Sequence, residues 1–536
     1  MYQFSGKLKM LAIILMVLGA VGTGISFMSA PKSLEEAKEI LAKQHDAHHG
    51  GHGSAHGEAK EDHATEAKAE DHAKETHAEE IHNEGEHAQD STAAATQEET
   101  HAQDSTAAAS HGEEAHAQDS TAAHTEPVVE HKEVKEELHA AAEAHGEDHG
   151  EAHAEHVYHQ MKNRPWSAFY VAMLFFLGVT LLVMAFYAAQ RVAQSGWSVV
   201  LFRVMEAITN NLHFVSIFVL IFIVLTAMHY THLFPWMADG VFDTASPNYD
   251  PIVDAKKWWM NVPGWTIRGI VYLAIWNGLR FIIRRKSIQQ DNGDLKLHKN
   301  LYNLSVGFVV TFMITESMMS WDWIMGIDPH WFSTLFGWYV LATFLVSALT
   351  VIAIVTIYLR SKGALPLVND SHIHDLAKFM FGFSVFWTYL WFAQFMLIWY
   401  ADMPEETTYF VQRFNEYKLP FLGMVVMNFV FPVLLLINSD FKSIPWFVVL
   451  GGIVILVGHY VDLFVMIMPG TVGGQWGFGI GEISGILFFM GLFIYATFSA
   501  FAKADPVAKG NPFLHESETF HYYIIEHRGE DNDSHH

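Results

Sequence analysis

The chain has 536 residues, of which 51% are hydrophobic and 17% charged, yet it carries a formal net charge of −26 and contains no cysteine. The missing cysteine excludes disulfides, Cys-ligated iron–sulfur clusters, CxxCH haem attachment, zinc ribbons and a catalytic thiol. Residues 31–165 hold 32 Asp/Glu against 10 Lys/Arg, a net charge of −22, which leaves −4 for the other 401 residues. A very acidic insert therefore interrupts a nearly neutral, apolar body.

Ten apolar runs of about 20 residues match the hydrocarbon thickness of a bilayer. Trp and Tyr gather at their ends, as in an interfacial belt, and the runs show almost no polar stripe. The sequence therefore predicts an all-α integral membrane protein with ten transmembrane helices. The predicted spans lie near residues 8–28, 166–190, 209–232, 265–284, 302–320, 333–358, 377–400, 421–438, 445–467 and 482–502.

The first span, within residues 1–30, also resembles a secretory signal peptide. Lys7 and Lys9 precede the apolar run, and Met28, Ser29 and Ala30 follow it. The apolar run is long for a signal peptide, however, and the cleavage motif is imperfect. We therefore expect a retained transmembrane helix.

Residues 31–160 form the acidic insert, which consists largely of Ala, His, Glu, Asp, Thr, Gly and Lys and contains about twenty histidines. Because this composition cannot bury a core, we expect a disordered or transiently helical segment. A nine-residue sequence that begins at His87 recurs from His101, which agrees with low complexity. We expect a solvated polyelectrolyte that titrates near pH ~6.5. Zinc, copper or nickel binding is the alternative, but the irregular spacing specifies no metal site.

Lys and Arg in short loops predict the orientation of the spans. The strongest basic cluster, Arg284–Lys299, follows the fourth span, and alternate loops at 233–264, 321–332, 401–420 and 468–481 are neutral or acidic. This pattern predicts that both termini are cytoplasmic and that the insert is periplasmic. The nine-helix membrane domain then covers residues 161–502, and a cytoplasmic C-terminal tail covers 503–536.

Ionisable residues within spans are costly, at roughly 2.5–3.5 kcal/mol each on insertion scales, so each suggests a function. In the predicted orientation they gather toward the outer ends of the spans, and we expect few in the inner halves. Glu316 and the pair His459 and Asp462 lie deepest, and the pair is three residues apart on one helix face. Because a carboxylate and an imidazole near a quinol hydroxyl can act as base and relay, the candidate proton-transfer residues are Glu316, Asp322, His459 and Asp462.

A candidate quinol site comprises His229 and His232, which share a face of the third predicted helix, together with Asp402 and Glu482. Each residue also has a structural explanation. The two histidines would bond backbone at a kinked helix end, Asp402 would touch interfacial water, and Glu482 would cap the tenth helix. Haem b between His229 and His459 is a further alternative, although the sequence offers no second histidine pair.

Residues 320–339 read SWDWIMGIDPHWFSTLFGWY and directly follow the Glu316 region. This motif resembles a signature of the smaller NrfD-like (polysulfide reductase-like) membrane subunits of alternative complex III, the ActF family. That complex is a bacterial quinol:cytochrome c oxidoreductase. The resemblance extends over residues 1–30 and about 160–525 and includes HYTHLFPW from His229. The long insert departs from the short connection that is usual in this family.

The resemblance implies two four-helix bundles, formed by spans two to five and six to nine, flanked by spans one and ten in a bacterial inner membrane. It implies menaquinol oxidation coupled to reduction of a cytochrome. The implied partners are the paralogous sister subunit ActC, a multihaem cytochrome c, an iron–sulfur protein, small membrane subunits and a terminal oxidase. We expect no haem or iron–sulfur cluster in this chain and no nucleic-acid partner.

Within this family the quinol site is assigned more strongly to the sister subunit than to the subunit that this chain resembles. Asp322 lies within the matched motif, whereas His459, Asp462 and Glu482 rest on their predicted depth alone. An autonomous ion or solute transporter and a purely structural anchor for redox partners are the alternative functions. A transporter would have discontinuous helices and charges near the membrane midplane.

Overall fold

The computed structural model describes residues 2–50 and 131–522, and the side chains of residues 2–43 and 154–522. Within these residues the fold is all-helical, and ten helical segments are long and apolar enough to cross a membrane. Each corresponds to one of the ten predicted spans. The prediction of a multi-pass helical membrane protein is therefore confirmed.

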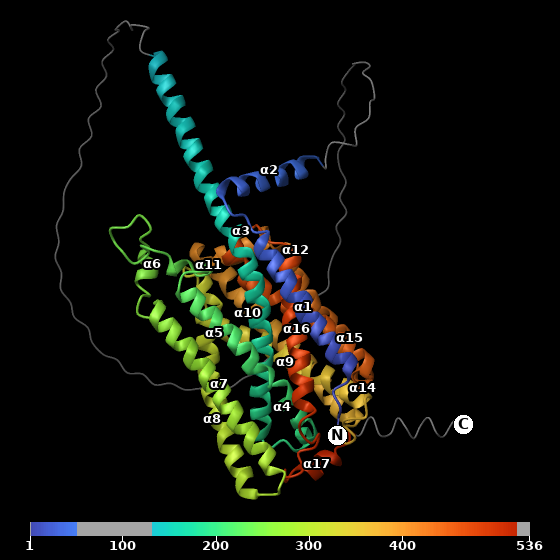
Figure 1. The fold of residues 1–536 in the computed structure, drawn as a ribbon. Coiled ribbons are helices and arrows are strands. Elements are labelled where there is room, and N and C mark those ends of the chain that lie inside the picture. Colours follow the sequence, from blue (N-terminus) through green and yellow to red (C-terminus); the bar gives the residue numbers. More distant parts are fainter. Residues whose placement is uncertain (1, 51–130, 523–536) are drawn as a thin grey trace, which may run out of the picture. The chain divides into compact units, whose positions relative to one another are not determined.

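The elements follow one another from α1 to α17 (Figure 1). Their bounds are α1 Gly6–Met28, α2 Leu34–Gly50, α3 His131–Val192, η1 Gly196–Leu201, α4 Phe202–Ile208, α5 Asn211–Ala227, η2 Pro235–Met237, α6 Pro251–Asp254, α7 Val262–Gln290, α8 Leu295–Trp323, η3 Met325–Ile327, α9 Phe336–Ser361, α10 Asp370–Ala401, α11 Pro404–Asn415, α12 Lys418–Val425, η4 Val426–Val430, α13 Phe431–Leu436, α14 Ser439–Ser443, α15 Pro445–Val472, α16 Ile480–Phe501 and α17 Leu514–Glu518.

The spans group into two bundles flanked by α1 and α16. Helices α5, α7 and α8 pack beside one another, and α9 packs with α10 and α15 while the α12–α13 span packs on α15. The two most buried spans are α3 and α9, the first helix of each bundle. They meet where Gly178 of α3 lies against the ring of Phe344 in α9, a contact that leaves no room for a larger side chain.

Helix α1 runs along α16 on a seam of small residues (Figure 1). A Cβ atom on Gly19 would overlap the backbone of Phe488, and one on Gly491 would lie 2.6 Å from the carbonyl oxygen of Ala12. Small residues at such positions let membrane helices approach closely, so that van der Waals contact holds them together. That the first span is retained and not cleaved stays a prediction.

The second span begins earlier than predicted. Pro165 suggests a helix start near residue 166, yet α3 is already helical before it and continues through it. The extension is held by a small apolar cluster in which Val157 and Met161 pack against Ala37 of α2. Residues 51–130 of the predicted low-complexity insert, and 523–536 of the tail, lie outside the described residues.

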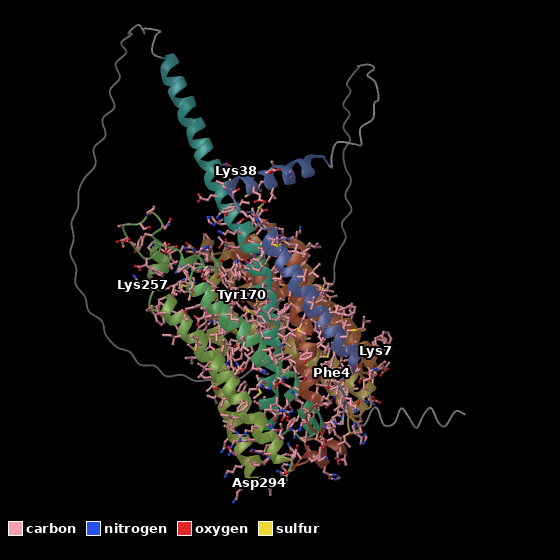
Figure 2. The ribbon with its side chains drawn as sticks, in the orientation of Figure 1. Phe4, Lys7, Lys38, Tyr170, Lys257 and Asp294 are labelled. Atoms are coloured by element: carbon pink, nitrogen blue, oxygen red, sulfur yellow. The ribbon has the colours of Figure 1, made fainter. Side chains whose placement is uncertain are left out.

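Different short helices lie at the two ends of the bundles (Figure 1). The α11 end carries α6, α11 and the start of α16, and the α17 end carries α14 and α17. Lys257 and Asp294 flank α7 at these two ends (Figure 2). At the α17 end the chain after α16 is docked, because Ser517 Oγ donates to Trp197 O at 2.7 Å and Asn369 Nδ2 donates to Phe520 O at 2.7 Å.

We expect Gly19→Ala to destabilise the protein by about 1–3 kcal/mol, because the added methyl overpacks the α1–α16 seam. The matched control is Gly24→Ala on the same helix, where a Cβ meets nothing within 4 Å. Thermal unfolding in detergent should show a lower midpoint for Gly19→Ala alone. Equal midpoints for the two variants would show that the seam is not closely packed.

Candidate functional site

Asp462 of α15 lies at the centre of a fully buried polar cluster in the second bundle. Its Oδ1 accepts a hydrogen bond from the Tyr339 hydroxyl, and its Oδ2 accepts from Thr343 Oγ1 at 2.7 Å and from Trp387 Nε1 at 2.8 Å. Tyr339 and Thr343 come from α9 and Trp387 from α10, and all these side chains are buried. Three donors from two other helices therefore hold one carboxylate within the membrane domain.

His459 lies beside this carboxylate, one helical turn earlier on α15. Its Nδ1 is 3.7 Å from Asp462 Oδ2, and the Trp387 ring packs edge-on against the imidazole at 5.3 Å between centroids. The predicted pairing of His459 and Asp462 on one helix face is therefore present. The imidazole is fully buried, and neither of its nitrogens has a hydrogen-bond partner among the described residues. Such a ring is available to accept or donate a proton.

The eighth span changes its helical pitch next to His459. Residues Val426–Val430 form a π-helical segment, a local feature that is frequent at functional sites. It places the buried Asn428 against Gly458, where a Cβ would overlap the Asn428 amide. Neither amide atom of Asn428 is hydrogen-bonded to a described residue. The bulge thus adds a second buried, unpaired polar side chain, packed against the residue that precedes His459.

Helix α11 contributes a buried cation that the sequence analysis missed within its predicted loop 401–420. Arg413 is 3% exposed, and its Nη1 donates to the Tyr409 carbonyl at 2.8 Å. Its guanidinium lies 3.2 Å from the Tyr409 ring centroid, while its Nε has no partner among the residues described. Burial lowers the pKa of Arg413 and raises that of the Tyr409 hydroxyl. The amphipathic pattern of 404–415 is the signal that would have revealed this helix.

Two small cavities adjoin Arg413. One, of about 10 Å³, is lined by Asp462, Tyr339 and Gln394, and the other, also about 10 Å³, by Asp328. A cavity of roughly 10–15 Å³ holds one water molecule if its walls are polar. A route of polar groups and water-sized spaces therefore runs from buried Asp462, past Arg413, to half-buried Asp328 at the α11 end.

A quinone ring does not fit at this cluster. Pockets for small organic ligands usually measure roughly 300–1,000 Å³, whereas the two cavities beside Asp462 and Arg413 hold about 10 Å³ each. Aromatic and aliphatic side chains make up most of their lining, and the polar side chains in it are Asp462, Asp328, Arg413, two tyrosines and two glutamines. This arrangement suits protons and single water molecules.

Asp322, the third predicted proton-transfer residue, lies in the other bundle and is clamped by an arginine. Arg268 of α7 donates from Nε to Oδ2 at 2.8 Å and from Nη2 to Oδ1 at 2.7 Å, and the Tyr272 hydroxyl donates to Oδ2 at 2.9 Å. A bidentate pair of this kind fixes geometry strongly. Asp322 is thus saturated with donors, and its contacts tie α7 to α8.

Glu316 of α8 is buried to the same degree but has a different environment. It is 1% exposed, its Oε1 has no hydrogen-bond partner, and no ion pair joins it to another described residue. It lines neither of the two cavities beside Arg413. Glu316 and Asp462 are therefore two separate buried carboxyl groups and not one site.

The prediction that His229 and His232 share a helix face is wrong. Helix α5 ends at Ala227, and His229 adopts a left-handed conformation with φ 60°. The Tyr230 amide bonds back to Leu225 O at 3.0 Å and the His229 amide to Thr226 O at 3.0 Å, which is the pattern of a Schellman cap. Both imidazoles are exposed, and no described contact joins His229 to His459.

The remaining predicted quinol residues are also separated. Asp402 is exposed at the C-terminal cap of α10, with φ 48°. Glu482 is buried at the start of α16, where its Oε2 accepts from the Gly479 amide at 2.8 Å and its Oε1 from Arg164 Nε at 2.9 Å. Glu482 therefore has the capping role that the sequence left open. The four residues do not converge on a common cavity.

A buried charge cluster at the α17 end was not anticipated, because few ionisable groups were expected there. Glu206 of α4 is 2% exposed and accepts from Arg203 Nη1 at 2.7 Å, from the Tyr187 hydroxyl at 2.6 Å and from Arg284. Arg203 also bonds Asp291 at 2.5 Å. The spacing of three residues between Arg203 and Glu206, inside an apolar stretch, could have indicated this cluster from the sequence.

The sequence matches no protein-family model, and no curated protein matches it. In the described part of the chain, no group of three or more His, Asp or Glu side chains is arranged to hold a metal ion. The polar cluster at Asp462, with the route past Arg413, is thus the best candidate site on geometric grounds.

We expect Glu206→Gln to destabilise the protein by about 3–5 kcal/mol, because it leaves buried arginines without their counter-charge. Glu405→Gln, in the exposed first turn of α11, is the matched control and should change stability by less than about 0.5 kcal/mol. Thermal or denaturant unfolding in detergent measures both. Similar unfolding midpoints would contradict a structural role for the Glu206 cluster.

Proposed function

We propose that this chain is a non-autonomous membrane subunit of a quinol-oxidising respiratory complex similar to alternative complex III. Its role is to carry protons between the membrane interior and the periplasmic face. The observation that carries the proposal is the polar route from Asp462 to Asp328. The resemblance of residues 320–339 to the ActF family supports the choice of complex.

The groups on this route have distinct chemical roles. The Asp462 carboxyl group and the His459 imidazole form a proton-exchanging pair, since His459 Nδ1 lies 3.7 Å from Asp462 Oδ2 and neither imidazole nitrogen is hydrogen-bonded to a described residue. Tyr339, hydrogen-bonded to Asp462, faces the first cavity and relays a proton to water there. Arg413 lines both cavities and, as a fixed cation, stabilises negative charge on Asp462 and Asp328.

The chain supplies no space for quinol at Asp462, so quinol oxidation is assigned to the paralogous sister subunit ActC. Menaquinol is the expected donor, and electrons pass to the iron–sulfur protein and multihaem cytochrome c and onward to a terminal oxidase. Because the chain contains no cysteine, clusters and covalent haems of such a complex belong to partner chains.

The orientation follows from basic residues that remain free after folding. Arg203 and Arg284 at the α17 end form ion pairs with Glu206, and Arg203 also pairs with Asp291. Exposed cations at this end still remain, namely Arg285, Lys296, Lys299 and Lys362. By the positive-inside rule the α17 end is cytoplasmic and the α11 end periplasmic in a bacterial inner membrane.

An autonomous transporter is the second candidate, and the irregular eighth span favours it. Transporters often bind substrate at interrupted helices near the midplane. Here, however, the chain passes from α12 through η4 to α13 without leaving the helical path.

Affinity isolation of the chain from its native membrane tests the assignment to a complex. We expect haem c and iron–sulfur subunits, together with a paralogous membrane subunit, to co-purify. Isolation of this chain alone in mild detergent, with its fold intact, would refute the respiratory assignment and favour a transporter.

In the isolated complex we expect Asp462→Asn to lower quinol:cytochrome c turnover by about 10²-fold or more, the lower range for loss of a proton-transfer group. Asp239→Asn, in the exposed loop after α5, is the matched control and should leave turnover unchanged. Thermal stability measured in parallel separates misfolding from lost proton transfer. Full turnover in a correctly folded Asp462→Asn complex would leave the chain as a structural anchor.

The absence of native cysteine makes the orientation directly measurable. We expect a single cysteine at exposed Asp243 to react with a membrane-impermeant maleimide added to spheroplasts, and one at exposed Lys299 to react only after lysis. The opposite labelling pattern would invert the topology.

A further inference from the structure

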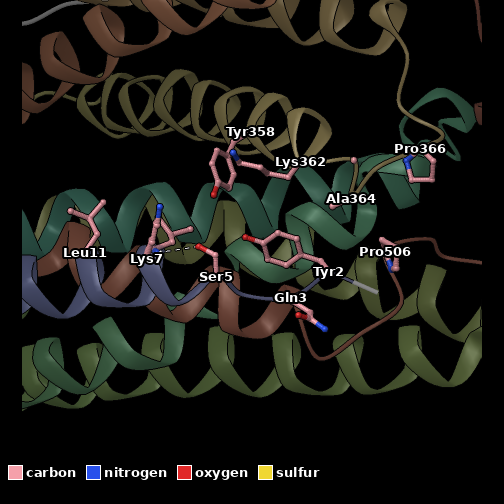
Figure 3. A pocket seen from close by; sticks show the side chains of 12 residues that line it. Tyr2, Gln3, Ser5, Lys7, Leu11, Tyr358, Lys362, Ala364, Pro366 and Pro506 are labelled. Carbon is pink, nitrogen blue, oxygen red and sulfur yellow. Dashed lines mark hydrogen bonds between the residues drawn. The ribbon is translucent and has the colours of Figure 1, made fainter.

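A basic cavity lies at the α17 end, away from the polar route. It measures about 770 Å³, is open on one side, and is lined by the chain leading into α1, the end of α9 and the segment after α16. Figure 3 shows Lys7 of α1 and Lys362, just after α9, on either side of the Tyr358 ring. No Asp or Glu is among the residues that line it.

The two lysines carry charge that the protein leaves unbalanced. Neither forms an ion pair with any residue that the structure describes, in contrast to Arg203 and Arg284 at the same end. Lys362 Nζ lies only over the Tyr358 ring, 5.6 Å from its centroid. A cavity with two cations and no anion is complementary to a negatively charged group.

An apolar groove adjoins the basic cavity. It measures about 470 Å³, lies between α1, α3, α9, α15 and α16, and shares Leu8 and Tyr358 with the cavity. Its lining is aliphatic and aromatic, with the tyrosine hydroxyls as the only polar side-chain groups. The basic cavity is therefore continuous with the apolar groove.

The length of the groove matches one membrane leaflet. Ile486 and Phe498 both line it and lie twelve residues apart on α16, which corresponds to about 18 Å along the helix axis. Half of a ~30 Å hydrocarbon core is about 15 Å. The groove thus runs from near the α17 end of α16 to beyond the middle of that helix, which is long enough for one acyl chain.

We propose that the cavity and groove together form a binding site for one anionic glycerophospholipid. The phosphate lies between Lys7 and Lys362, and an acyl chain fills the groove beneath Tyr358. The two cations favour a phospholipid over a quinone, whose head group is neutral. The occupant joins the α1–α16 pair to both bundles, and this role does not depend on the proposed proton transfer.

The test uses the full-length chain purified in detergent and delipidated. Dioleoyl phosphatidylglycerol, dioleoyl phosphatidylcholine and menaquinone are each titrated, and bound lipid is counted by native mass spectrometry. We expect one phosphatidylglycerol to bind more tightly than phosphatidylcholine. A juxtamembrane lysine is worth roughly 1 kcal/mol toward an anionic lipid, so Lys7→Gln with Lys362→Gln should weaken phosphatidylglycerol binding about 30-fold.

Matched variants separate the two parts of the site. Lys9→Gln alters a neighbouring lysine that does not line the cavity and should bind like the wild type. Val457→Trp fills the groove from its exposed side and should weaken both phospholipids, whereas Leu450→Trp, on the same helix outside the groove, should not. Thermal midpoints identify any variant that is misfolded.

Three results would overturn the proposal. The first is equal affinity for phosphatidylglycerol and phosphatidylcholine in the wild type. The second is unchanged phosphatidylglycerol binding in the double lysine variant. The third is displacement of phosphatidylglycerol by equimolar menaquinone, which would make the groove a quinone site. Failure of the proton-transfer proposal would leave all of these measurements unaffected.

Discussion

The absence of water from the hydrocarbon core is the constraint on which this structure depends. Every charged or polar side chain within a span must find its partners inside the protein or remain at a high free-energy cost. The chain meets this requirement by convergence of helices. Asp462 takes donors from α9 and α10, Asp322 takes two bonds from Arg268, and Glu206 accepts from arginines of α4 and α7. Each buried acid thereby ties several helices together.

The carboxyl groups of Asp462, Asp322 and Glu206 differ in the kind of partner that each one has. Asp322 and Glu206 are paired with arginine, so they act as fixed joints between helices. Asp462 has neutral donors only, and it lies beside His459, whose nitrogens are free, and a water-sized cavity. A carboxylate held by neutral groups can change its protonation state without breaking an ion pair. Among these three acids, Asp462 is therefore the one beside a histidine whose nitrogens have no hydrogen bond to a described residue.

Sequence patterns predicted some of these features well, because they arise from neighbours in the chain. The lengths of ten apolar runs were sufficient for the spans, and the spacing of His459 and Asp462 was sufficient for their common face. The same spacing rule failed for His229 and His232, because α5 ends at Ala227 and His229 is itself the left-handed cap residue. A periodicity rule assumes that the helix continues, and a local backbone bond can end it.

The apolar length of a span and the depth of a residue within it are properties of one segment of the chain. The sequence by itself therefore predicted the number of spans and the burial of Asp462. Its partners are not local. Tyr339 is 123 residues away and Thr343 is 119 residues away along the chain, and Arg268 is 54 residues from Asp322. Which acid meets an arginine, and which meets a cavity, depends on how the helices pack. That packing distinguishes a structural ion pair from a group free to exchange a proton.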